Sequence, residues 1–196
     1  MHDDDHYVTA RDMAKISKAA LENETFRYVA CKPNYYIAPT NKDKHGKELW
    51  NHHKMVKRTM FNYDGVEGGK TGYTTKAGGT LVTFAKRGDQ ELIVVDLCAH
   101  GYELYEDTIK MLNYGFNNYK TIAPFKTMNT VLKDDTYGFL KIGNELSPYK
   151  IPLKHLNDVT VMLEKNQSVS KLTYKCKDNK YIISYDGKQI GSVKLH

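Results

Sequence analysis

A glycine-rich segment around Lys70 has the residue types that can bind a carboxylate. It reads Gly68-Gly69-Lys70-Thr71-Gly72-Tyr73-Thr74 and precedes Ala77-Gly78-Gly79 and an apolar run. A lysine ammonium and a threonine hydroxyl both donate hydrogen bonds to an anion, and a glycine beside them lets a ligand approach the backbone. If this strand lies at a sheet edge, its backbone can also pair with an extended peptide. The ordinary alternative is a glycine-rich strand start with an exposed lysine.

The histidines and cysteines form no recognisable metal or disulfide pattern. His45, His52 and His53 are close in sequence, but no carboxylate or cysteine completes a ligand spacing, so we expect them on a surface loop. The cysteines are scattered and odd in number, and we expect them to be small buried residues. They are Cys31, Cys98 and Cys176. We therefore predict no cofactor and no metal.

Periodic patterns around Lys70 predict a mixed unit of helices and strands. Thr9 followed by Asp12 is a helix-start signal, and apolar residues then recur at helical spacing over 9–22. Runs rich in β-branched residues, broken by a short turn that contains glycine, predict a hairpin. The further elements expected are a helical turn over 24–31, a surface hairpin or long loop over 34–57, strands over 68–72, 80–85 and 91–97, and a helix over 102–118.

After Tyr119 the pattern changes to short β-type runs separated by turns. The runs cover 127–132, 136–142, 159–164, 171–176, 180–185 and 188–194. No long helical pattern returns, which is typical of a small all-β module. We therefore predict one domain over residues 1–119 and a β-rich domain over residues 120–196, with a linker at 121–124.

The net charge of +6 is not evenly distributed along the chain. Residues 1–119 are balanced, whereas residues 120–196 contain 13 lysines, no arginine and seven acidic residues. Lysine lacks the planar fork with which arginine reads base edges, so we expect no nucleic-acid partner. Two explanations of the lysine excess remain: the lysines contact an acidic membrane surface or wall polymer, or they form an ordinary solvated surface. The longest apolar run, Leu92–Val95, is far shorter than the roughly 18 residues of a membrane-spanning helix.

Several ordered segments within residues 1–119 resemble the second half of a low-molecular-weight penicillin-binding protein. They are HYVTARDMA at 6–14, WNHHKM at 50–55, DGVEGGKTGYTTKAG at 64–78 and LNYGF at 112–116. More narrowly, they resemble the serine-type D-alanyl-D-alanine carboxypeptidases that trim peptidoglycan. Residues 120–196 resemble the second domain found in many members. The resemblance implies an α+β class: an incomplete transpeptidase domain of the penicillin-binding-protein and β-lactamase type, followed by a small all-β domain.

The resemblance also implies a role for each residue of the glycine-rich segment. Lys70 supplies positive potential near the terminal carboxylate of the substrate, and Thr71 hydrogen-bonds that carboxylate. Gly72 permits close approach, and the backbone N–H of Tyr73 is one of two oxyanion donors. Thr74 is a further hydroxyl contact. These roles make Lys70 and Tyr73 catalytic, and Lys70, Thr71, Gly72 and Thr74 substrate-binding.

The family motifs S-x-x-K, S-x-N and K-T-G are expected in that order, and here only K-T-G is in place. The two S-x-x-K matches, Ser147–Lys150 and Ser168–Lys171, follow Lys70 in the β-rich part, and we assign them no catalytic role. No S-x-N precedes Lys70. We therefore expect the sequence to begin just after the S-x-N segment of the family, and this chain alone to be inactive.

The function implied is a secreted or membrane-associated hydrolase of the bacterial cell envelope. It would remove the terminal D-alanine from peptidoglycan pentapeptides through an acyl-enzyme, and β-lactams would inhibit the complete enzyme covalently. A further expected partner is the missing N-terminal segment of the same protein. The alternative is a non-catalytic module that binds wall peptides or a partner. A class A β-lactamase is disfavoured because that family lacks the trailing β domain.

Overall fold

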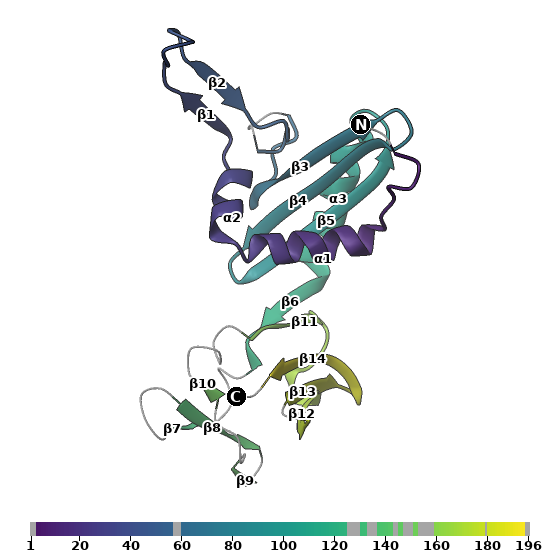
Figure 1. Cartoon of the computed structure of the whole chain (residues 1–196). Coiled ribbons are helices and arrows are strands. Elements are labelled where there is room, and N and C mark those ends of the chain that lie inside the picture. Colours follow the sequence, from purple (N-terminus) through teal and green to yellow (C-terminus); the bar gives the residue numbers. More distant parts are fainter. Residues whose placement is uncertain are drawn as a thin grey trace. The chain divides into compact units, whose positions relative to one another are not determined.

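The computed structural model describes residues 3–56, 60–124, 130–132, 137–142, 145–146, 151–152, 159–178 and 180–194. The chain divides into two compact units, Met1–Asn117 and Asn118–His196. Among the described residues of the first unit, two helices precede five strands and a third helix follows them, and strands dominate the second unit (Figure 1). The α+β class expected from the sequence is confirmed.

A three-stranded antiparallel sheet forms the centre of the first unit. Its strands are β3 (Val66–Thr74), β4 (Gly78–Arg87) and β5 (Gln90–Ala99), in the order β3-β4-β5. Gly88, at φ 58°, makes the tight turn between β4 and β5. The predicted hairpin is confirmed, and β3 lies at an edge of this sheet among the described strands.

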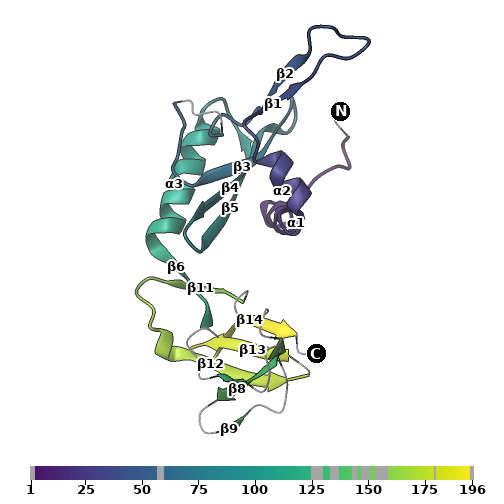
Figure 2. The same ribbon diagram turned by 90° about the vertical axis from the view of Figure 1, so that its left-hand side faces the viewer.

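Helices cover both faces of the sheet (Figure 2). They are α1 (Ala10–Leu21), α2 (Glu24–Ala30) and α3 (Glu103–Asn118), close to the predicted ranges. The Thr9 side chain caps α1 by accepting a hydrogen bond from the Asp12 N–H, as its spacing predicted. One face of the sheet buries Val82 and Phe84 against Leu21 of α1. The other face buries Leu81, Ala85 and Val94 against α3, whose contributions include Leu112 and Phe116.

The segment between α2 and β3 is a hairpin followed by a compact loop. β1 (Asn34–Ile37) pairs with β2 (Lys47–Trp50), and both strands project away from the central sheet (Figure 1). The hairpin alternative is thus confirmed. The loop that follows is not all at the surface, because His53 and Met55 are buried. The expectation of a surface position holds for His45 and His52 and is wrong for His53.

The second unit is built from short antiparallel strands. β6 (Tyr119–Ile122) pairs with β11 (Val161–Glu164), so the predicted linker is wrong at Thr121 and Ile122. β12 (Leu172–Lys177), β13 (Lys180–Tyr185) and β14 (Lys188–Lys194) form a second sheet. Shorter strands pair in a third: β7 (Thr130–Leu132), β8 (Tyr137–Ile142), β9 (Glu145–Leu146) and β10 (Ile151–Pro152). The core of this unit includes Leu163, Tyr181 and Ile183.

The cysteines, expected to be buried, differ in their exposure. Cys31 is half-buried, but Cys98 is exposed, so its expected burial is wrong. The register between β4 and β5 shifts near Leu81, and Cys98 takes a φ of 63°, which marks a bulge that turns its side chain outward. The side chain of Cys176 lies outside the described residues.

The two late S-x-x-K matches are not arranged as a nucleophile and base where the structure describes them. Ser168 caps a single 3-10 turn and lies 2.8 Å from Ser170 through their hydroxyl oxygens. Lys171 Nζ is 3.3 Å from Asp186 Oδ2 rather than paired with Ser168. The match at 147–150 lies outside the described residues.

Candidate functional site

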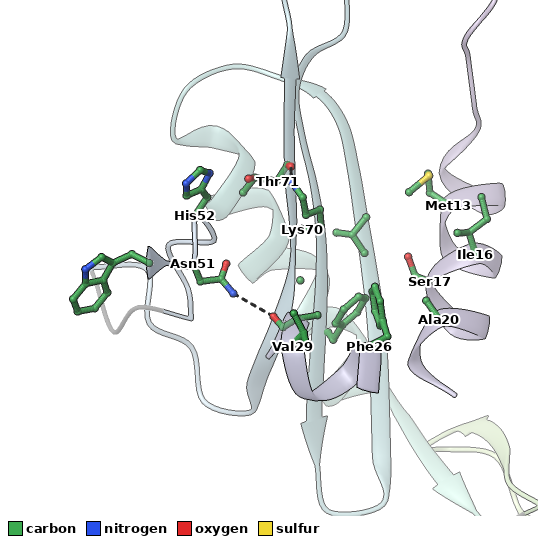
Figure 3. Close-up of a pocket in the computed structure, with 15 residues that line it drawn as sticks. Met13, Ile16, Ser17, Ala20, Phe26, Val29, Asn51, His52, Lys70 and Thr71 are labelled. Atoms are coloured by element: carbon green, nitrogen blue, oxygen red, sulfur yellow. Dashed lines mark hydrogen bonds between the residues drawn. The ribbon is translucent and has the colours of Figure 1, made fainter. Parts of the chain in front are cut away.

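Lys70 and Thr71 line a groove beside the edge strand β3 (Figure 3). The groove has a volume of about 520 Å³. Its other walls come from α1, α2 and the segment after β2. These walls present mostly apolar side chains, with a few polar groups among them: Ser17, Asn51 and His52. A mostly apolar cleft with a few convergent polar groups is the usual form of a ligand site.

Lys70 brings positive charge to this groove. Its side chain is exposed, and its ammonium donates a hydrogen bond to the backbone carbonyl of Thr71. No aspartate or glutamate is among the residues that line the groove. Among the described residues, no ion pair of Lys70 is found. A cation in a groove without carboxylates is arranged to attract an anionic ligand.

The remaining residues of the glycine-rich segment continue along β3 beyond the groove lining. Gly72 lies opposite Thr80, and a Cβ added at Gly72 would come within 2.5 Å of Thr80 Oγ1. Tyr73 is 76% exposed. Thr74 Oγ1 accepts a hydrogen bond of 3.0 Å from the Ala77 N–H, which closes the turn into β4. The structure therefore gathers Lys70 and Thr71 in the groove and places the other three residues on the adjoining stretch of the same edge strand.

Asn51 fixes the loop that forms one wall of the groove. Its Nδ2 donates to the carbonyl oxygen of Ala30 at 3.2 Å (Figure 3) and to that of Lys32 at 3.0 Å. Its Oδ1 accepts from the His53 N–H at 2.9 Å. These bonds tie the end of α2 to the loop after β2, and so set the positions of Trp50 and His52 next to Lys70.

Arg27 joins α2 to the sheet. Its guanidinium is 2.9 Å from Glu67 Oε2 on β3 and 2.6 Å from Glu91 Oε1 on β5. Arg27 Nε also donates to the Leu21 carbonyl at 3.4 Å. A planar, half-buried guanidinium that bridges two strands holds α2 firmly against β3. The apolar wall of the groove is thereby fixed relative to Lys70.

His53 is buried directly behind β3. Its Nε2 lies 2.9 Å from Thr83 Oγ1, and its ring packs edge-on against Tyr105. Nδ1 has no hydrogen-bond partner among the described residues. Burial lowers the pKa of His53 from 6.5 to about 4, while the Val82 backbone acts weakly in the opposite direction. The imidazole is therefore neutral at pH 7.

We expect the stability of the first unit to fall as pH drops from about 6.5 to about 4. In this window the unfolded chain binds a proton at His53 and the folded chain does not, so acid favours unfolding. The full effect is about 3 kcal/mol in the free energy of unfolding. Urea unfolding at several pH values measures it. His53→Asn removes the titration, and an unchanged pH slope in that variant would contradict the assignment.

The sequence pattern identified Lys70 and Thr71 but missed most of the opposing wall. The missed residues are Met13, Ile16, Ser17 and Ala20 of α1, Phe26 and Val29 of α2, and Asn51. The helix over 9–22 was predicted, but periodicity alone does not tell which other element its apolar face meets. A signal existed for Asn51, because asparagine between two β-type runs often binds nearby backbone groups.

The comparisons with known proteins agree on one family. A family model described as D-alanyl-D-alanine carboxypeptidase matches residues 1–101. The D-alanyl-D-alanine carboxypeptidase DacF of Bacillus subtilis is 28% identical over 196 residues, which cover 97% of this chain and 46% of that protein. DacC of Escherichia coli is 32% identical over 121 residues, or 61% of this chain and 28% of the relative. The chain thus spans at most about half the length of these relatives.

Solved structures show the same fold. Penicillin binding protein 5 from Haemophilus influenzae matches with a TM-score of 0.64 and 22% identity, over 100% of this chain and 57% of that one. A mutant of the Streptomyces K15 DD-transpeptidase matches with a TM-score of 0.54 and 29% identity, over 59% of this chain and 45% of the other. The family model covers more than half of the residues, and the K-T-G strand lies within it. The chain therefore belongs to the D-alanyl-D-alanine carboxypeptidase family of low-molecular-weight penicillin-binding proteins.

Proposed function

We propose that this chain supplies the carboxylate-binding part of a serine-type D-alanyl-D-alanine carboxypeptidase. Such an enzyme removes the terminal D-alanine from peptidoglycan stem peptides. The observation that carries the proposal is the position of Lys70 and Thr71, which match the family's K-T-G, on an edge strand that lines a groove free of acidic side chains. Positive charge, a hydroxyl and an open strand edge together suit the carboxylate end of an extended peptide.

In this proposal the peptide lies along β3, with its terminal carboxylate at Lys70 and Thr71. Gly72 adds no side chain between ligand and backbone, and Thr74 gives a second hydroxyl beyond it. The Tyr73 N–H donates to the oxyanion that forms when a serine attacks the penultimate D-alanine carbonyl. Collapse of that intermediate breaks the amide bond and releases D-alanine, and water then hydrolyses the acyl-enzyme.

The attacking serine and its lysine base belong to an S-x-x-K segment, and no such motif precedes Lys70 in these 196 residues. Activity would need that segment and the S-x-N segment. β-Lactams would acylate the same serine in the complete enzyme. The groove walls of Ile16, Val29 and Phe26 support the proposal, because they provide the apolar surroundings that strengthen a charge-assisted hydrogen bond.

The proposal places residues 1–119 in the catalytic domain and residues 120–196 in the β-rich domain that follows it. Peptidoglycan is the substrate, so the protein acts outside the cytoplasm, in the cell envelope.

Within the described residues, no helix is both long and apolar enough to cross a membrane. The lysines of residues 120–196 give that domain a charge suited to an anionic wall polymer or membrane surface.

The second candidate is a non-catalytic module that binds wall peptides or a partner in the groove that Lys70 and Thr71 line. Covalent labelling by a fluorescent penicillin separates the two. The chain is tested alone and in combination with a family segment that carries S-x-x-K and S-x-N. Labelling only in the combination supports the carboxypeptidase, and its absence supports the binding module.

A further inference from the structure

The outer face of one sheet in the second unit carries a row of exposed lysines. The sheet consists of β12, β13 and β14 (Figure 2), which pair so that Lys177 lies opposite Lys180 and Lys180 lies opposite Lys194. Directly paired side chains are about 5 Å apart at their Cβ atoms, so these three lysines, the lysine row, follow one line across the sheet. Lys175 precedes Lys177 by two residues on β12 and is on the same face.

No carboxylate within the sheet balances the charge of the lysine row. The three strands contain no aspartate and no glutamate. Among the described residues, none of the four lysines on this face forms an ion pair, and Asp178 in the turn after β12 is bonded to none of them. Like charges directly opposite one another destabilise a sheet, so the row lowers the stability of the unit unless an anion is bound to it.

The aromatic side chains of these three strands lie on the opposite face of the sheet. Tyr181 is buried in the core of the unit, and Tyr174 and Tyr185 pack against that core. The strands therefore offer no ring beside the lysine row on which a nucleic-acid base could stack, and none that could insert at a membrane interface. The lysine face instead presents a line of point charges with the exposed Ser192 hydroxyl beside it, which suits a linear polyanion.

We propose that the lysine row binds a wall polymer whose backbone is a chain of polyol phosphodiesters. The inference goes beyond the proposed function and rests on it only for the place of action, the cell envelope. Lysine is a compact point charge and a common ligand of phosphate. Successive phosphates of the polymer meet successive lysines, and the Ser192 hydroxyl is placed to bond to a polyol hydroxyl. Each contact releases a bound counterion, so salt weakens the binding.

The test is a calorimetric titration of the full chain with poly(glycerol phosphate) at several salt concentrations. We expect saturable binding at low salt, with a slope of about −2 when the logarithm of the association constant is plotted against that of the salt concentration, or ~0.7 for each of three phosphates. Lys180→Gln, at the centre of the row, is expected to weaken binding about fivefold at low salt and to make the slope shallower by about 0.7. Because this change also removes two like-charge contacts, the variant should melt no lower than the unchanged chain.

Lys165→Gln is the matched control, because it makes the same change of charge in the same unit. Lys165 is exposed and follows β11, outside the sheet that carries the row. The control should keep the affinity and the salt slope of the unchanged chain. Equal weakening in the two variants would overturn the proposal, since it would show that only the net charge of the unit matters. Absence of binding at low salt, or binding that does not change with salt, would also overturn it.

Vesicles of phosphatidylcholine and phosphatidylglycerol test the membrane as the other anionic surface. The chain should bind them more weakly than the polymer at equal phosphate concentration, and equal or tighter binding would overturn the proposal and assign the row to a membrane.

The outcome is separable from that of the proposed function. Polymer binding without penicillin labelling in the combined sample would retain the lysine row as a binding site and remove the catalytic assignment. Labelling without polymer binding would retain the carboxypeptidase and overturn the role of the row.

Discussion

Replacing Lys70 by alanine is expected to weaken binding of a peptide that ends in D-alanyl-D-alanine by about 10- to 100-fold. This corresponds to ~1.5–3 kcal/mol, the usual contribution of a hydrogen bond to a charged group. The physical reason is that Lys70 is the one cationic side chain assigned to the groove lining within the described residues. The measurement is an NMR titration of the chain, in which signals from β3 report on the bound peptide.

Lys76→Ala is the control for this prediction. Lys76 lies in the turn after β3 and pairs with Asp4 at 2.5 Å, outside the groove lining. The variant should bind the peptide as the unchanged chain does. A peptide ending in a carboxamide should bind the unchanged chain as weakly as the carboxylate peptide binds Lys70→Ala. Equal affinities for carboxylate and carboxamide would show that Lys70 does not recognise the terminal charge.

Gly69→Ala is expected to destabilise the first unit by about 3 kcal/mol. A Cβ at this position would lie 2.0 Å from the Val82 carbonyl oxygen and 2.7 Å from Cδ2 of His53. The Val82 oxygen belongs to the backbone of the neighbouring strand, so relief requires β3 to move away from β4. The midpoint of urea unfolding measures the loss, at an unchanged slope if the transition stays two-state.

Gly88→Ala is a control for the loss of a glycine in the same sheet. No atom lies within 4 Å of a Cβ added at Gly88, although its φ of 58° favours glycine. We expect Gly88→Ala to lower the free energy of unfolding by about 1 kcal/mol, from that backbone preference alone. A Gly69→Ala loss no greater than that of Gly88→Ala would mean that the contact with His53 and Val82 is not tight in solution.

Local signals predicted most elements of the first unit. The helix over 9–22 depends on the Thr9 cap and on apolar spacing, both of which lie within one segment. The glycine-rich strand and the hairpin after it are likewise defined by nearby turn residues. For the same reason Lys70 and Thr71 could be identified in advance, since the motif and the strand that presents it are contiguous.

Features that depend on distant segments could not be predicted in this way. His53 is buried because Gly69 leaves room for its ring, and no spacing within 34–57 reveals that fit. Strand β6 forms because Tyr119–Ile122 pairs with Val161–Glu164, far along the chain. Cys98 is exposed by a bulge that arises from the register of two strands.

The most direct test of the central claim is covalent labelling with a fluorescent penicillin, read on a denaturing gel. The 196-residue chain alone should remain unlabelled. Combined with a family segment that bears S-x-x-K and S-x-N, the sample should show label on that added segment, and Lys70→Ala in the chain should reduce it. Stoichiometric labelling of the chain alone would contradict the account, because it would require a nucleophile within these residues. Label that does not depend on Lys70 would contradict the role of the groove.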